Sequence, residues 1–218
     1  MFKKFICLGN SYRQGGACIA GKEISDSNQL GAWFRPVGRE HASLSRTSYD
    51  FAIGGIYSCD VDTYSPLPTQ CENYTLSADP QWKRYPAFPR HFLDKLVDMP
   101  HDLWYSSNAS SSRFGLNDRI SMDDPALNGQ SLYFVRLPVA ELYCVEEGYE
   151  FSRPRLRMAF AYAGVPYKLR VTDFSLCSRT MQVGDCVKLG PCYVTVSLGC
   201  PYKVDNNCYK LVAGYVAL

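Results

Sequence analysis

The clearest alternation of hydrophobic and polar positions lies between residues 151 and 174. From Leu156 to Tyr162 every second residue is apolar, and the intervening and preceding positions include Arg153, Arg155 and Arg157. A period of two is typical of a β-strand with one buried face. Ala163-Gly164 would form a two-residue turn, after which apolar residues alternate again from Tyr167 to Val171. The pattern predicts an antiparallel ribbon.

The polar side of this ribbon is basic. A two-residue turn places Arg157 opposite Arg170 and Ala159 opposite Lys168, with no acidic residue on that side of either strand. Like charges directly opposite each other destabilise a sheet. Two explanations fit the sequence equally well. Either an anionic partner binds this face, or acidic residues from elsewhere in the chain pair with its arginines.

Shorter segments of the same kind recur on both sides of a different central region. Apolar or alternating segments punctuated by glycines occupy 3–9, 17–24, 31–38 and 56–64, with a polar loop expected at 10–16. They predict an all-β unit over residues 1–78. Similar segments at 131–137, 141–147, 184–189, 192–199 and 208–218 predict a second all-β unit over 130–218, with one face in water. In the 192–199 segment, Val194, Val196 and Leu198 point one way, and Tyr193, Thr195 and Ser197 the other. The expected fold class is mainly β: two small barrels joined by a connection.

The connection, residues 79–129, contains one helical signal. Phe92, Leu93, Leu96 and Val97 have the spacing of one helix face, and prolines at 89 and 100 bracket them. A helix of about ten residues is expected there. A serine-rich loop follows and ends in Asn117-Asp118-Arg119, a run more specific than a spacer needs. Asp118 is also able to fix the backbone of its own loop through a side-chain hydrogen bond.

Composition limits the functional classes. Hydrophobic residues make up 46% and charged residues 20%, which is ordinary for a globular protein, and the net charge is only +2. Any nucleic-acid binding must therefore come from a local basic patch. No apolar run is long enough to span a membrane or to form a signal peptide, so a cytoplasmic protein is expected.

The ten cysteines include no C-x-x-C pair, although four of them lie close together between residues 186 and 208. Buried free thiols are favoured over a metal site, and neither a metal nor a cofactor is predicted. Asp60 and Asp62 alternate on one expected strand, which a polar outer face explains better than a shared metal does. Catalysis has little support, because no nucleophile, base and oxyanion donor come together. No catalytic residue is predicted.

Two segments of the first unit carry candidate ligand chemistry. Residues 16–22 read GACIAGK, but Glu23 follows where a phosphate-binding loop needs Ser or Thr, and the segment looks extended. An NTPase is rejected, while Lys22 remains a candidate cation for a phosphate. Trp33 and Arg35 alternate on one strand, as a stacking ring and a phosphate-binding guanidinium would. The alternative, slightly favoured, is a buried Trp with Arg packed over it.

Several of these segments together resemble one known family. FICLGNSYRQGGACIAGKEI, GAWFRPVG, FGLNDRI, YVTVSLG and CYKLVAGYV occur in this order, nearly end to end, and look like bacterial dual OB-domain-containing proteins. The resemblance implies two OB-fold barrels, which agrees with the two β units. One visible departure is Gly9, where the family usually has Ala.

By analogy with other OB folds, the resemblance implies binding of nucleic acid or a nucleotide, in a bacterial stress or phage-defence setting. We expect single-stranded nucleic acid, or a nucleotide-like ligand held between the barrels. The candidate binding residues are Arg13, Lys22, Glu23, Trp33, Arg35, Asn117, Asp118, Arg119, Arg153, Arg155, Arg157, Tyr193 and Lys210.

Two other functions remain open. One is an enzyme that acts on a nucleotide or modified base, which requires Lys22 and Glu23 to share one cleft with residues 117–119. The other is an adaptor that uses an exposed apolar barrel face to bind a protein partner.

Overall fold

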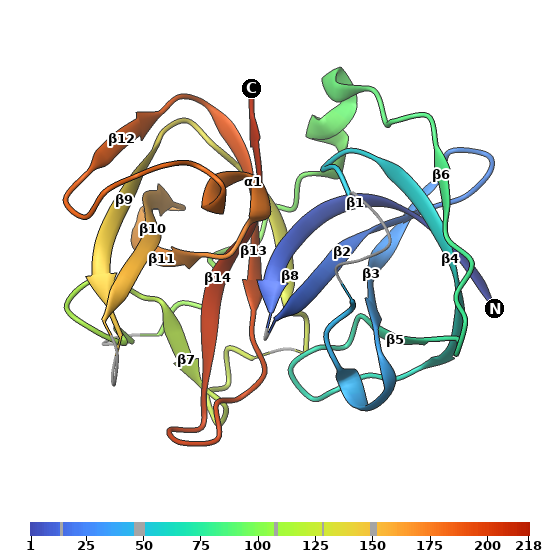
Figure 1. Cartoon of the computed structure of the whole chain (residues 1–218), viewed down its shortest axis with the longest axis horizontal. Coiled ribbons are helices and arrows are strands. Elements are labelled where there is room, and N and C mark those ends of the chain that lie inside the picture. The colour runs from blue at the N-terminus through green and yellow to red at the C-terminus, as the bar shows by residue number, and fades with distance from the viewer. Residues whose placement is uncertain (14, 46–50, 107–108, 128, 149–151) are drawn as a thin grey trace.

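The computed structural model describes residues 1–13, 15–45, 51–106, 109–127, 129–148 and 152–218. Its strands form two sheets, each wrapped around its own core, and the two bodies lie side by side (Figure 1). The mainly β fold class is therefore confirmed. Within the described ranges, no helix is long and apolar enough to cross a membrane.

The first barrel follows the order β1-β2-β3-β5-β4, and a β1–β4 pairing closes it. Phe5, Phe34 and Tyr57 pack in its core. Its strands are β1 (Phe2–Arg13), β2 (Gly16–Ile24), β3 (Leu30–Val37), β4 (Ile56–Tyr64), β5 (Asn73–Leu76) and the edge strand β6 (Lys83–Tyr85), with a short 3-10 helix η1 (Arg39–His41) after β3.

The loop expected at 10–16 is largely absent. β1 continues to Arg13 and pairs with β2 up to Gly16, with residue 14 outside the described part of the chain. The polar residues of this extension have partners that the local pattern does not reveal. Ser11 forms a β-bridge with Asp173, and the backbone N–H of Tyr12 donates to the Thr172 carbonyl at 2.9 Å. The end of β1 therefore reaches the second barrel.

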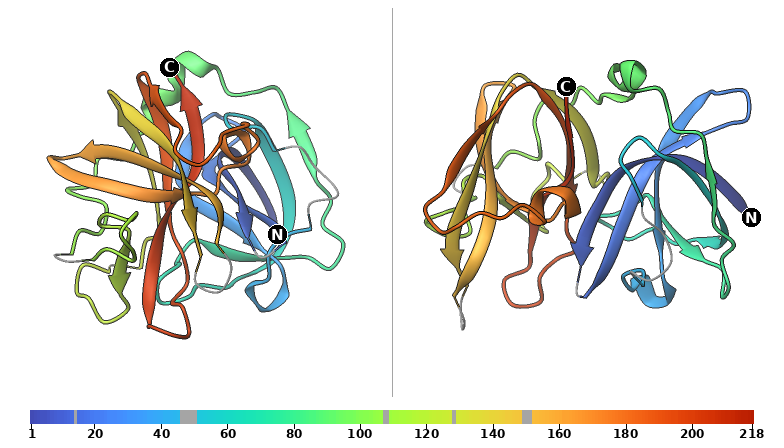
Figure 2. Two further views of the ribbon diagram at one scale, coloured as in Figure 1. Left: turned by 60° about the vertical axis from the view of Figure 1, so that its left-hand side comes forward. Right: turned by 45° about the horizontal axis from the view of Figure 1, so that its top comes forward.

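The connection contains η2 (Arg90–Leu96), a 3-10 helix of 7 residues rather than the longer α-helix expected. It begins after Pro89, as the sequence predicts. Because a 3-10 helix repeats every three residues, Leu93 and Leu96 are buried together, whereas Phe92 is 39% exposed. The expectation that Phe92 shares their buried face was wrong. Figure 2 shows η2 at one end of the contact between the two barrels.

The second barrel is a curved 8-stranded sheet with the order β12-β9-β10-β11-β14-β13-β8, with β7 paired to β14. The predicted ribbon is β10–β11, and Arg157 lies opposite Arg170 and Ala159 opposite Lys168, as expected. Its apolar side packs in the core. The elements are β7 (Arg119–Ser121), β8 (Leu132–Leu137), β9 (Ala140–Glu147), β10 (Arg153–Tyr162), β11 (Val165–Val171), the short helix α1 (Phe174–Cys177), β12 (Cys186–Leu189), β13 (Cys192–Leu198) and β14 (Asn207–Ala217).

β6 joins the first sheet and β7 the second, so the pairings reach into the segment that we assigned to the connection. The division at residues 78 and 130 remains a prediction.

The polar side of β13 is not in water, contrary to expectation. All seven residues of β13 are buried, because this side faces the first barrel. The Thr195 hydroxyl donates to the Leu8 carbonyl, and Tyr193 packs with Phe134 in a core cluster that includes Trp33. The alternation of β13 therefore separates two buried environments: the second core and the contact between the barrels.

Candidate nucleic-acid interface

Both barrels contain the same strand arrangement. Three consecutive antiparallel strands form a meander, and the third pairs in parallel with a later strand: β3 with β5 in the first barrel, β11 with β14 in the second. OB barrels bind ligands across strands 2 and 3 of this meander. The equivalent faces are the outer sides of β2–β3 and of β10–β11. The two faces have different environments.

The β2–β3 face of the first barrel is covered. Lys22 and Trp33 lie on it and both bind Asp98 of the connection, Lys22 through its ammonium at 2.6 Å and Trp33 through its indole N–H at 3.0 Å. The Lys22 ammonium also donates to the Leu96 carbonyl at 2.8 Å and lies 5.4 Å from the centre of the Trp33 ring. The Trp33 side chain is buried. These two residues therefore fix the connection against the barrel.

Arg35 continues this face and joins the two barrels. Its guanidinium donates to the hydroxyls of Ser131 and Ser197 at 3.0 and 3.2 Å, both on the second-barrel side. The Glu72 carboxylate accepts from the backbone N–H and the hydroxyl of the same Ser131 at 2.5 and 2.8 Å. Arg35 is only 1% exposed. Its guanidinium therefore binds groups inside the protein and does not face a ligand at the surface.

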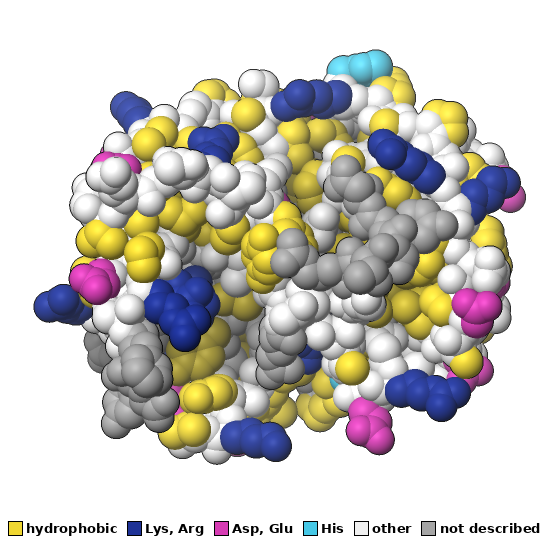
Figure 3. All heavy atoms as spheres, viewed as in Figure 1, with side chains coloured by type: hydrophobic (Ala, Val, Ile, Leu, Met, Phe, Trp, Pro, Cys, Tyr) yellow, Lys and Arg dark blue, Asp and Glu magenta, His cyan; other side chains and the backbone are white. Residues whose placement is uncertain are grey.

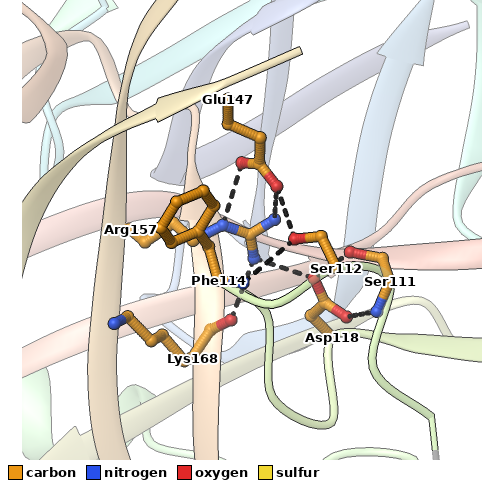
Figure 4. A network of polar contacts seen from close by, with 7 residues as sticks. All are labelled: Ser111, Ser112, Phe114, Asp118, Glu147, Arg157 and Lys168. Carbon is orange, nitrogen blue, oxygen red and sulfur yellow. Dashed lines mark hydrogen bonds and ion pairs between the residues drawn. The ribbon is translucent and has the colours of Figure 1, made fainter. Parts of the chain in front are cut away.

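The β10–β11 face of the second barrel is covered at its centre by the 111–118 loop, which Arg157 binds (Figure 4), while Arg153 and Arg170 on the same face are exposed. The Arg157 guanidinium forms two hydrogen bonds to Glu147, at 2.6 and 3.0 Å, one to Asp118 at 2.8 Å and one to the Lys168 carbonyl at 3.1 Å. Arg157 and Asp118 are each 3% exposed. For this arginine, pairing with acids from elsewhere in the chain is the explanation that holds.

The run at 117–119 supplies part of this network. Asp118 accepts from the backbone N–H and hydroxyl of Ser111 at 2.7 and 2.5 Å, so it fixes its own loop as the sequence suggested. A Cβ on Gly115 would lie 2.2 Å from an Asp118 oxygen, which explains the glycine two residues before Asn117. Asn117 has a φ of 49° and donates to the Pro166 carbonyl at 2.8 Å. Both side chains therefore hold the loop against the ribbon.

The pKa shifts of Glu147 and Arg157 agree with this pairing. Burial acts to raise the pKa of Glu147, but hydrogen bonds from Arg157 and Ser112 outweigh it and lower that pKa below its ordinary value. Burial and hydrogen bonding also oppose each other at Arg157, with the signs reversed. Burial lowers its pKa, and hydrogen bonds to Glu147 and Asp118 raise it above the ordinary value. The network is therefore held in its charged form.

Around Arg157, four other cations lie on the same face: Arg153, Arg155, Lys168 and Arg170. Arg153 and Arg170 are exposed, and Arg155 and Lys168 are half-buried. Within the described part of the chain, none of the four forms an ion pair with a carboxylate. Partial burial and the neighbouring Arg155 guanidinium lower the pKa of Arg170. Such like-charge crowding is what a bound anion would relieve.

Aromatic rings border these cations. Tyr143 on β9 lies directly opposite Arg157, and the Lys168 ammonium is 4.1 Å from the centre of its ring. Phe114 lies beside the Arg157 network (Figure 4), with the Arg113 guanidinium 4.6 Å from its ring. The face thus combines rings with positive charge. In Figure 3, Lys and Arg side chains are spread over both halves of the molecule among hydrophobic ones.

The remaining candidates lie apart from this face. Tyr193 is buried against Phe134 with ring centres 5.2 Å apart, and Lys210 is 1% exposed inside the second barrel. Arg13 donates to the Cys200 thiol at 3.8 Å. Arg119 pairs with Asp205 at 3.5 Å, and Glu23 pairs with Lys3 at 2.8 Å.

The enzyme hypothesis requires Lys22 and Glu23 to share one cleft with residues 117–119, and the positions of these residues test it. Lys22 and Glu23 bind Asp98 and Lys3, whereas Asp118 and Arg119 bind Arg157 and Asp205 in the second barrel. The structure does not bring the five proposed pocket residues into one cleft.

The ten cysteines are all free thiols, and their environments differ. Cys7, Cys59, Cys144, Cys192 and Cys208 are buried, and Cys186 is exposed. Burial raises the pKa of Cys59 to about 12. No group of three or more potential metal ligands occurs among the residues that the structure describes.

The sequence reasoning missed the acids that neutralise its candidates. Asp98 binds Lys22 and Trp33, Glu72 holds the serine that Arg35 contacts, and Glu147 binds Arg157. Along the sequence, Glu147 and Arg157 are 10 positions apart, and Lys22 and Asp98 are 76 positions apart. The packing of the connection and of the two barrels brings Asp98 and Glu72 to their partners, whereas the pairing of β9 with β10 brings Glu147 to Arg157.

A family model described as a dual OB-containing domain matches residues 3–215. The chain belongs to this family. The match covers nearly the whole chain, so the resemblance carried by the five quoted segments is confirmed. No curated protein matches the dual OB-containing chain.

Two solved structures share a distant likeness with this dual OB-containing chain. The tetrameric p202 HIN2 has 9% sequence identity and a TM-score of 0.31, over 97% of this chain and 87% of that one. A murine DNA-binding protein bound to double-stranded DNA has 7% identity and a TM-score of 0.28, over 99% and 95%. At these TM-scores neither likeness supports an argument about function.

Proposed function

We propose that this dual OB-containing protein binds single-stranded nucleic acid across the β10–β11 face of its second barrel. The observation that carries the proposal is the set of four cations on this face, Arg153, Arg155, Lys168 and Arg170, without a carboxylate partner among the described residues. Strands 2 and 3 of an OB barrel are the usual ligand-binding surface.

The contrast between the barrels supports this assignment. On the first barrel the equivalent face carries Lys22, Trp33 and Arg35, each bound to a group of the connection or of the second barrel. A nucleic acid would have to separate the barrels to reach them. On the second barrel the 111–118 loop covers the centre of the basic face around Arg157, and Arg153 and Arg170 remain exposed beside it.

The chemistry of the β10–β11 face suits a single strand better than a duplex. Its cations are available for phosphates, and Tyr143 offers a ring on which an unpaired base can stack once Lys168 turns toward a phosphate. In a duplex the base faces are already stacked on each other. The bacterial stress or phage-defence setting that we propose rests on the family resemblance alone.

The test is a fluorescence anisotropy titration of the full chain with labelled 12-nucleotide single-stranded DNA and RNA at low salt. We expect saturable binding that weakens steeply as salt increases, because each phosphate contact releases counterions. The charge-reversed variant Arg155→Glu/Arg170→Glu should bind at least about tenfold more weakly, since both side chains lie where the phosphates would.

The matched control reverses two cations elsewhere. Lys83→Glu/Arg84→Glu changes net charge by the same amount on β6, where both residues are exposed. It should weaken binding by less than about twofold at moderate salt, where distant charges are screened. Equal losses in the two variants would show attraction by net charge rather than a site. A flat titration of the wild type with both polymers would end the proposal.

A further inference from the structure

A second candidate site lies between the barrels, away from the basic face. A cavity there has a volume of about 640 Å³, and residues from both barrels and the connection line it: Asn10, 51–54, Ala87, Phe88, Arg90, Leu93, 173–175 and 215–217. Pockets for small molecules usually measure about 300–1,000 Å³. The view in Figure 3 shows hydrophobic side chains along the boundary between the two halves.

The cavity walls are largely apolar and aromatic. Phe88, Phe174 and Tyr215 contribute rings, and Phe174 is itself backed by Tyr12 at 3.8 Å between ring centres. A backbone hydrogen bond of 2.8 Å from Phe88 to the Gly54 carbonyl fixes one wall. Flat heteroaromatic groups fit such walls because their faces stack on rings, provided that polar groups meet their edges.

Polar groups lie both in the buried part of this cavity and at its exposed edge. Asp173 lines it and is only 1% exposed, and burial raises the pKa of its carboxyl group. Asn10 lines it as well and donates its amide to the Phe51 carbonyl at 2.7 Å. Arg90, in contrast, is exposed and contacts the Ala217 carbonyl. A second guanidinium, that of Arg179, lies 5.7 Å from the centre of the Tyr215 ring.

From this arrangement we infer that the cavity binds a purine nucleoside monophosphate, with the base inward and the phosphate at Arg90. One oxygen of the Asp173 carboxylate already accepts from the Ser175 hydroxyl at 2.6 Å and from the Leu176 N–H at 2.8 Å, and N–H donors on the base edge meet its remaining acceptor positions. The exposed guanidinium binds the phosphate, for which its planar fork is well suited. The cavity is distinct from the β10–β11 face, so this inference does not depend on the polymer proposal.

Isothermal titration calorimetry with the full chain tests it. The probes are GMP, AMP, CMP and UMP, together with guanosine and inorganic phosphate as the separate halves of the ligand. We expect at least one purine monophosphate to bind about tenfold more tightly than the pyrimidine nucleotides, guanosine or phosphate. Arg90→Ala should remove the advantage over guanosine, since it removes the phosphate contact; within the protein it removes an exposed contact to the Ala217 carbonyl.

Filling the cavity provides a variant that does not depend on charge. Ala52→Trp places a large ring at an exposed position of the lining and should abolish binding, whereas Ala78→Trp, exposed but outside the cavity, should leave it unchanged. Asp173→Asn keeps an acceptor for the backbone N–H of Leu176 and removes the charge, so it should weaken purine binding while the fold persists.

Three results would overturn the inference. They are no heat from either purine monophosphate at millimolar concentration, binding that survives Ala52→Trp, and binding lost in Arg155→Glu/Arg170→Glu. The last would place the nucleotide on the basic face. Binding retained in that variant, with single-stranded polymer binding lost, would support both sites independently.

Discussion

Trp33 of the first barrel donates its indole N–H to the Asp98 carboxylate at 3.0 Å, and the same oxygen accepts the backbone N–H of Phe134 at 2.8 Å. The other oxygen of Asp98 binds Lys22 at 2.6 Å. One carboxylate therefore joins the first barrel, the connection and β8 of the second barrel. The ring and cation that resemble a base-stacking site are oriented inward by this bond.

Removing this carboxylate should destabilise the whole chain. Asp98→Ala removes the acceptor of the Trp33 N–H and leaves the Lys22 ammonium with the Leu96 carbonyl but no carboxylate, in a region where both side chains are mostly buried. We expect a loss of roughly 2–4 kcal/mol in the free energy of unfolding. Urea denaturation followed by tryptophan fluorescence measures it.

Asp94→Ala is the matched control for Asp98→Ala. Asp94 also pairs with an arginine, Arg136 at 3.3 Å, but both side chains are more than half exposed. Surface pairs of this kind contribute little, so the loss should stay below about 1 kcal/mol. Similar losses in the two variants would contradict the role that we assign to Asp98.

The close approach of the barrels also predicts a contrast between two glycines. A Cβ on Gly214 would lie 2.2 Å from the Leu8 carbonyl oxygen, whereas a Cβ on Gly9 would meet its nearest atoms at 3.6 Å, an ordinary contact. Gly214→Ala should therefore force β1 and β14 apart and lower stability by about 1–3 kcal/mol. Thermal unfolding of the two variants should show a clear drop in Tm for Gly214→Ala alone.

Gly9→Ala should be nearly neutral, in agreement with the alanine that the family usually has there. A large loss for Gly9→Ala, or none for Gly214→Ala, would mean that the backbones of β1 and β14 are not in contact as described.

The elements that the sequence predicted well are those with a strictly local cause. The β10–β11 ribbon alternates at every position and carries a turn whose two residues, Ala163 and Gly164, adopt positive φ angles of 49° and 79°. The strand register of this ribbon follows from the alternation and the turn alone. β5 and β6 have 4 and 3 residues and no such alternation, so they were missed.

The environment of a polar face was harder to predict. Alternation on β13 identifies two sides but does not indicate whether the polar side faces water or another barrel. Thr195 and Ser197 find their partners in Leu8 and Arg35, which are 187 and 162 positions away in the chain. For the same reason Trp33 and Arg35 look like ligand-binding groups in the sequence and prove to be contacts between the barrels.

The arginines of the β10–β11 ribbon should have two different roles, one in stability and one in nucleic-acid binding. Arg157→Met leaves Glu147 and Asp118 without their cation in a buried network, and should cost about 3–5 kcal/mol of stability. Arg155→Met removes a cation without an ion-pair partner in the described chain, and should change stability by less than about 1 kcal/mol while weakening nucleic-acid binding.

Both variants are compared by urea denaturation and by anisotropy with single-stranded DNA. The result that would contradict this division is a stable Arg157→Met protein, or an Arg155→Met protein with wild-type affinity and salt dependence. The first would remove the structural role of the Arg157 network. The second would exclude Arg155 from the interface.

Lys210 gives a prediction about pH. Its side chain is 1% exposed, its amine has no hydrogen-bond partner among the described residues, and the centre of the Tyr167 ring is 5.5 Å away. Burial lowers the pKa of Lys210 from 10.5 to about 8. Below pH 8 both the folded and unfolded states carry the charge, and the folded protein bears the full cost of burying it, roughly 3 kcal/mol from the difference in pKa.

Between pH 8 and 10.5 the unfolded state binds more protons at Lys210 than the folded state, so this cost falls as pH rises. Lys210→Met fills a similar volume without the charge. It should therefore be more stable than the wild type at pH 7, by about 1–3 kcal/mol, and the gap should narrow by pH 9.5. Comparing the two proteins cancels the titration of the tyrosines and cysteines that they share.

Urea denaturation of both proteins at pH 7 and pH 9.5 measures the gap. Lys203→Met, at an exposed position between β13 and β14, is the control, and its free energy of unfolding should equal that of the wild type at both pH values. A gap for Lys210→Met that stays constant with pH would mean that the amine is not buried as a charged group. A Lys210→Met protein less stable than the wild type at pH 7 would mean that the ammonium has a partner worth more than its burial costs.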